Sequence, residues 1–97
     1  MSTPFSTAAK LTAWGPLTAN TPVKVPAIGL SGRLIARISV DIGSGPGSPI
    51  YYGYDNGVNA STGKVIASGE ESRILPTSQD IWIFSADGGQ TGFVEEF

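Results

Sequence analysis

The sequence predicts an all-β fold, a small antiparallel β-sandwich or jelly-roll-like domain that follows an extended, proline-containing N-terminal arm. In residues 33–42, apolar and polar side chains alternate, and a period of two is typical of a half-buried strand. The apolar positions of this segment are Leu34, Ala36, Ile38, Val40 and Ile42. Short apolar segments separated by turn-forming residues then continue to residue 97, and no segment has the helical period.

The predicted arm covers residues 1–32 and the predicted sandwich domain residues 33–97, with the division near Ser31-Gly32. Four prolines in the arm oppose a long helix and favour extended or edge segments. Within it, residues 10–14 and 21–26 are expected to form short strands flanked by proline. These strands either complete the sheets of the domain itself or reach a neighbouring protein, and the two roles are compatible.

The predicted domain contains strands of four to ten residues separated by turns. After the alternating strand, residues 43–49 form a loop because they include three glycines and two prolines. Asp55-Asn56-Gly57 predicts a tight turn, since Asn-Gly tolerates the positive φ values of a type I′ hairpin. The other expected strands cover residues 50–54, 64–67, 70–75, 81–84 and 91–97.

Composition indicates one small domain with few charges. Only 14% of the 97 residues are charged, against roughly a quarter in ordinary soluble domains, so hydroxyl and amide groups must cover much of the surface. Such a surface suits contact with another protein, because hydroxyls cost less to desolvate than ions. A net charge of −2 with dispersed basic residues argues against nucleic-acid binding. There is no apolar run of membrane-span length and no signal-like N-terminus, so we expect a cytoplasmic product.

The chain lacks the residue types on which most catalytic and metal sites depend. It has no His and no Cys. The adjacent pairs Glu70-Glu71 and Glu95-Glu96 point to opposite faces if they lie in strands, so neither can form the facing carboxylates of a glycosidase. Residues 55–59 lack the spaced acidic ligands of a calcium loop. We therefore expect no enzyme activity, no metal and no cofactor.

Aromatic residues form the remaining candidate site. Five aromatic residues could either form a platform that stacks on sugar rings or belong to the core. Aromatic residues in small β domains are mostly core. The five residues are Trp14, Tyr51, Tyr52, Tyr54 and Trp82. Apolar residues of the arm are expected to contact a partner, because an extended segment has little core of its own. These predicted contact residues are Phe5, Leu11, Trp14, Val23 and Val25.

One series of segments resembles small virion proteins of tailed bacteriophages. The series is Pro-Ile-Tyr-Tyr-Gly at 49–53, Val-Asn-Ala-Ser-Thr-Gly-Lys-Val-Ile at 58–66, Gly-Glu-Glu at 69–71, Asp-Ile-Trp-Ile-Phe at 80–84 and Phe-Val-Glu-Glu at 93–96. The resemblance covers roughly residues 33–97 and rests on turn positions and hydrophobic spacing.

The resemblance implies a β-sandwich virion protein, such as a decoration or cement protein that bridges and stabilises neighbouring shell subunits. Its expected partner is the major capsid protein, with a trimer or dimer of this chain, no nucleic acid and no membrane. Its expected location is the virion. A tail, baseplate or neck adaptor and a small carbohydrate-binding module are the alternatives.

Overall fold

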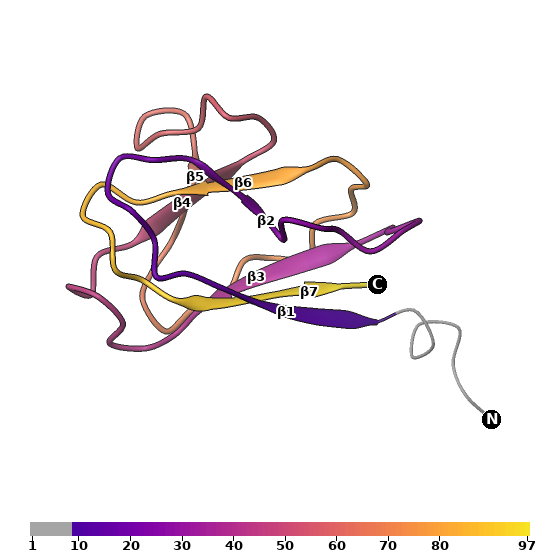
Figure 1. Ribbon diagram of the computed structural model, residues 1–97, viewed down its shortest axis with the longest axis horizontal. Helices are drawn as coiled ribbons and strands as arrows, with labels where there is room; N and C mark the ends of the chain where they lie inside the picture. Colours follow the sequence, from indigo (N-terminus) through magenta and orange to yellow (C-terminus); the bar gives the residue numbers. More distant parts are fainter. Residues whose placement is uncertain (1–8) are drawn as a thin grey trace.

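The computed structural model describes residues 9–97, which form seven strands and no helix (Figure 1). The strands are β1 (Lys10–Trp14), β2 (Val23–Val25), β3 (Ala36–Val40), β4 (Ile50–Gly53), β5 (Lys64–Ile66), β6 (Ile81–Phe84) and β7 (Gly92–Glu96). No helix in this part of the chain has the length and apolar character needed to cross a membrane.

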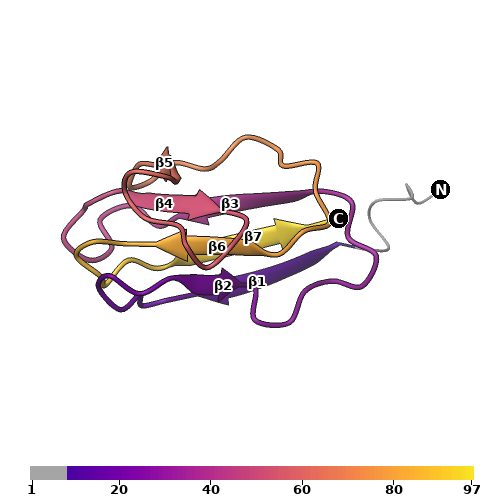
Figure 2. The same ribbon diagram turned by 90° about the horizontal axis from the view of Figure 1, so that it is seen from above.

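The strands form two antiparallel sheets that pack face to face (Figure 2). One sheet has the order β1-β7-β3 and the other has the order β2-β6-β4-β5. The chain crosses between the sheets at each step from β1 to β4, as in a jelly roll, which has eight strands in two sheets. The predicted all-β sandwich of jelly-roll type is therefore confirmed.

The position beside β3, where an eighth strand would lie, is taken by residues 69–75. Leu75 exchanges two backbone hydrogen bonds with Ala36, and the Ser72 backbone N–H donates to the Ile38 carbonyl at 2.7 Å. The Ile38 N–H donates to the Ser72 hydroxyl oxygen instead of a backbone carbonyl. The expected strand at 70–75 is thus reduced to isolated bridges, because a side chain replaces one acceptor of the ladder.

The described part of the predicted arm belongs to the sandwich. All five residues of β1 pair with β7 in the first sheet, and the three residues of β2 pair with β6 in the second. Between residues 9 and 32, the arm therefore completes the sheets of the domain itself, and Ser31-Gly32 marks no boundary between an arm and a domain.

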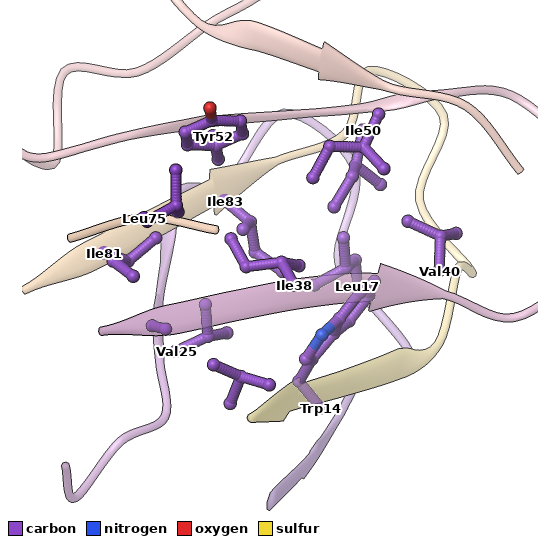
Figure 3. Close-up of a cluster of buried hydrophobic side chains, with 13 residues drawn as sticks. Trp14, Leu17, Val25, Ile38, Val40, Ile50, Tyr52, Leu75, Ile81 and Ile83 are labelled. Atoms are coloured by element: carbon purple, nitrogen blue, oxygen red, sulfur yellow. The ribbon is translucent and has the colours of Figure 1, made fainter. Parts of the chain in front are cut away.

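The hydrophobic core lies between the two sheets (Figure 3). Its members are Trp14, Leu17, Val25, Ala36, Ile38, Val40, Ile50, Tyr52, Ile66, Leu75, Ile81, Ile83 and Val94. Ile38 is central and fully buried, as the alternation of residues 33–42 predicts.

The inward face of β3 is shorter than the sequence predicts. Leu34 is 68% exposed and Ile42 is 88% exposed, so the expectation that they face the core is wrong. The N–H groups of Leu34 and Ile35 both donate to the Phe97 carbonyl, which shows that the regular ladder starts only after them. At the other end, β3 stops at Val40 and Ile42 lies in the following loop.

The expected tight turn at Asp55-Asn56-Gly57 is present, because the Val58 N–H donates to the Asp55 carbonyl at 3.4 Å, but it is not a type I′ hairpin turn. β4 and β5 are joined by residues 54–63, and neither Asn56 nor Gly57 has a positive φ. The Asp55 carboxylate accepts a hydrogen bond from the Gly57 N–H at 2.8 Å, so the turn is held by a side chain.

Replacing Ile38 by Asp should unfold the protein, because it places an unpaired charge in the core. We expect a loss of at least about 4 kcal/mol, which is comparable to the whole stability of a small domain. Leu34→Asp is the matched control. If the alternation of residues 33–42 placed Leu34 in the core, this variant would be equally destabilised, but Leu34 is exposed and we expect almost no change in stability. Denaturant unfolding followed by circular dichroism measures both, and equal destabilisation would contradict the shortened inward face.

Candidate partner-binding surface

The outer face of the β1-β7-β3 sheet is the surface best suited to bind another protein. Strand register places its residues in two rows across the sheet. We call this surface the three-strand face, and its rows are Leu11–Glu95–Arg37 and Ala13–Phe93–Ser39. Within residues 9–97, no other strand lies on this outer side of the sheet, whereas the inner face of the same sheet packs on the core (Figure 1).

Two large apolar side chains are exposed on the three-strand face. Leu11 of the edge strand β1 is 63% exposed, and Phe93 of the central strand β7 is 39% exposed. Leu11 lies opposite Glu95 and Phe93 opposite Ala13, so the two side chains are diagonal neighbours, about 7–8 Å apart at their backbone positions. Covering them would remove apolar area from water, which favours association with another protein.

The charges on this face largely neutralise one another. The Arg37 guanidinium donates to Glu95 Oε1 at 2.9 Å through Nη2 and lies 3.4 Å from Glu71 Oε2 through Nε. The hydrogen bond from Arg37 to Glu95 and the Glu95 charge raise the pKa of Arg37, and desolvation opposes the shift. Because Arg37 is already paired within this chain, it does not need a carboxylate from a binding partner. A partner protein with an uncharged surface can therefore contact this face.

The edge of this sheet at β1 is open. β1 pairs with β7 on one side only, and no other strand of the described chain pairs with it. An open edge presents unpaired N–H and C=O groups that can accept a strand from another chain. Leu11 lies on this edge strand, so strand addition and apolar contact would involve the same part of the molecule.

The structure divides the predicted contact residues. Leu11 is exposed, as a contact residue must be, but Trp14 and Val25 are buried in the core and Val23 is partly buried against it. These three residues were expected to contact a partner because an extended arm has little core of its own. Since β1 and β2 pair with the two sheets, their inward side chains belong to the core of the sandwich. Phe5 lies outside the described residues.

Trp14 is fixed in the core by a close approach to β7. Its Nε1 donates to the Phe93 carbonyl oxygen at 3.0 Å, and its ring lies against Gly92. A Cβ at Gly92 would overlap the Ser39 carbonyl oxygen and lie 2.5 Å from Trp14 Cζ2. Glycine is thus required where β7 passes between Trp14 and β3.

The predicted aromatic platform is divided between the two faces of the second sheet. Tyr52 is in the core, while register places Tyr51 and Trp82 on the outer face, each partly exposed. The loop after β4 covers part of this face, because the Val58 side chain lies against Gly53. Of the predicted platform residues, Tyr51 and Trp82 therefore remain partly exposed on this face, and Tyr54 is 44% exposed in the loop after β4.

The polar candidates have structural roles. Glu95 points outward and Glu96 is buried, so the prediction that this pair diverges is confirmed. Asn59 Oδ1 accepts from the N–H groups of Ser61 and Thr62, which makes residues 55–62 a hydrogen-bonded loop. Within residues 9–97, no three His, Cys, Asp or Glu side chains gather as metal ligands.

Phe93 is the surface residue that the sequence analysis missed. The strand at 91–97 was expected, and inward Gly92 and Val94 place Phe93 on the opposite face by alternation. A large aromatic residue at an outward strand position was the available signal.

Comparisons with known proteins support the fold. No family model matches this sequence, and neither does any curated protein. Among solved structures, the chain is similar to one described under the words "Bacillus endospore appendages form a novel family of disulfide-linked pili". The match has a TM-score of 0.56 and 20% identity, and it covers 91% of this chain and 80% of that chain. At this identity, the likeness shows a shared β-sandwich fold.

Gly92→Ala should destabilise the protein by about 1–3 kcal/mol or more, because the added methyl group has no space between Trp14 and β3. Gly29→Ala is the control, since its Cβ would meet only Glu96 Oε2 at 3.4 Å. Denaturant midpoints of the two variants provide the comparison. A Gly92→Ala midpoint equal to that of the wild type would contradict the close approach of Trp14.

Proposed function

We propose that this protein is a structural, non-catalytic subunit that binds a phage-type capsid and stabilises it by bridging neighbouring shell subunits. The observation that carries this proposal is the three-strand face, which exposes Leu11 and Phe93 while its charges are paired with one another. A subunit that binds a shell needs an uncharged contact area on a body that does not deform. The packed core of the sandwich supplies that body.

The resemblance to tailed-phage virion proteins supports the capsid as the partner. The endospore appendage structure supports a role in assembly more generally, because it shares the fold and its description places it in pili. Those pili are disulfide-linked, whereas this chain has no cysteine. Its own assembly must therefore rest on noncovalent contacts, and many symmetry-related copies allow each contact to be weak.

Carbohydrate binding is the second candidate, and the partly exposed pair Tyr51 and Trp82 favours it. Aromatic rings on an outer sheet face can stack on sugar rings. Lys24 lies beside Trp82 in the strand register and adds a hydrogen-bond donor. This surface and the three-strand face lie on opposite sides of the sandwich, so variants separate the two functions.

The double variant Leu11→Gln, Phe93→Gln should bind poorly to phage-like particles that lack this protein. Loss of both apolar contacts should lower the apparent affinity by about tenfold or more, equivalent to about 1.4 kcal/mol. Co-sedimentation with the particles measures binding, and cryo-electron microscopy locates the bound protein. Ile42→Gln is the matched control, because Ile42 is also exposed but lies in the loop after β3.

Unchanged binding of the double variant would remove the three-strand face as the contact surface. Absence of particle binding by the wild type, together with glycan binding that Trp82→Ala abolishes, would support the carbohydrate alternative. Circular dichroism of each variant shows whether the fold is retained.

Deletion of residues 1–8 should leave a folded sandwich, whereas deletion of residues 1–16 should unfold it because β1 is lost from the first sheet. Comparing these deletions in the same co-sedimentation measurement tests the predicted contact at Phe5. Full binding without residues 1–8 would exclude that contact. If the variant lacking residues 1–8 were unfolded, the described strands would be insufficient for folding.

A further inference from the structure

Tyr52 places a polar group at the margin of the core. Its ring packs with the core residues, and only 7% of the residue is exposed. Its hydroxyl oxygen points away from the neighbouring core side chains (Figure 3). The hydroxyl has no hydrogen bond with another described residue, and it is not one of the unpartnered oxygens that are closed off from solvent, which belong to Thr12, Gln90 and Glu96. The Tyr52 hydroxyl is therefore free to bond to a ligand.

Tyr52 lines a pocket of about 320 Å³ at one side of the sandwich. The pocket lies where edge strand β5 of the second sheet meets residues 71–73, which run beside β3 of the first sheet. Because the ring of Tyr52 is in the core, its outward hydroxyl is the part that reaches this pocket. A single water needs only about 10–15 Å³ of such space, so a side chain with a polar end fits.

Two positively charged side chains line the same pocket, Lys64 and Arg73. Strand register places Lys64 directly opposite Tyr52, so both side chains leave the same face of the sheet, with their Cβ atoms about 4.5–5.5 Å apart. Lys64 and Arg73 are exposed, and neither forms an ion pair with a described residue. Both charges are therefore available to a ligand beside the Tyr52 hydroxyl.

The charge balance around the pocket suits one carboxylate. Glu71 also lines the pocket, and its Oε2 lies 3.4 Å from Nε of Arg37, which is paired with Glu95 as well. With Lys64 and Arg73, this group has three positive and two negative side chains. A single negative charge neutralises the remainder, whereas a phosphate monoester carries about −1.5 to −2 at pH 7 and exceeds it.

We propose that this pocket binds the carboxylate of an aspartate or glutamate side chain on a partner protein. A carboxylate accepts about four hydrogen bonds, and the Tyr52 hydroxyl, the Lys64 ammonium and the Arg73 guanidinium supply donors. Val65 lines the pocket and is 61% exposed, so it offers the methylene groups of such a side chain an apolar contact that an inorganic anion cannot use. This contact is separate from the apolar side chains of the three-strand face and does not require a capsid as the partner.

Titration of the full-length, ¹⁵N-labelled protein with Nα-acetyl-glutamate methylamide tests the proposal by NMR. We expect saturable shifts of the amide signals of Lys64, Val65 and Arg73, which line the pocket. The corresponding glutamine compound has the same shape without the charge and should cause none.

Tyr52→Phe is the sharpest variant, because it removes the hydroxyl and leaves the ring in the core. The hydroxyl has no partner among the described residues, so denaturant unfolding should show unchanged stability, while affinity for the glutamate probe should fall about fivefold or more. Lys64→Gln should weaken binding to a similar extent. Lys24→Gln is the matched control, since it makes the same change of charge in β2, at the opposite edge of the same sheet, and should bind like the wild type.

Several results would overturn the assignment. Absence of saturable shifts, or an equal response to the glutamine compound, would show that the pocket does not recognise a carboxylate. Wild-type affinity of Tyr52→Phe would show that the hydroxyl takes no part in binding. Saturation of the same signals by inorganic phosphate at lower concentration would assign the pocket to a phosphate group. All of these readouts use a free probe, so they do not depend on whether the protein joins a shell.

Discussion

β7 is the strand on which both the core and the outer surface of the molecule depend. It lies between β1 and β3, and its strict alternation sends Gly92, Val94 and Glu96 inward while Phe93 and Glu95 face out. Gly92 makes room for Trp14, Val94 fills the core and Glu96 closes one end. A one-residue slip of β7 would exchange the two sets, burying Phe93 and Glu95 and exposing Val94.

The buried pair of Arg33 and Glu96 joins three distant parts of the chain at that end. Arg33 holds the carbonyls of Thr77 and Gln79 from the segment before β6, while Glu96 holds the backbone of Leu30. Removing one partner would leave the other as a buried unpaired charge, which is far more unfavourable than replacing both. The pair therefore fixes two loops against β7.

The fold class could be read from the sequence because alternation and turn residues are local properties. Ile38 and the opposite orientations of Glu95 and Glu96 follow from alternation alone. Trp14 and Leu34 show its limit: alternation orders side chains within a strand but does not give the strand's ends or its partners. Trp14 became core because β1 pairs with β7, and Leu34 became exposed because the ladder begins after it. Both facts depend on residues far away in the sequence.

The two margins of the β1-β7-β3 sheet differ in kind. Beside β3, residues 69–75 and the Ser72 hydroxyl form hydrogen bonds with the backbone of the strand. Because these residues form isolated bridges, they offer no regular ladder with which a strand of another chain could pair. Among residues 9–97, the β1 margin of this sheet is a regular strand that pairs on one side only. One molecule can therefore pair its β1 with one strand of a neighbouring molecule. The β3 side of the same sheet offers no second regular edge for a further strand. Growth of this sheet by strand pairing between copies would therefore stop after one addition.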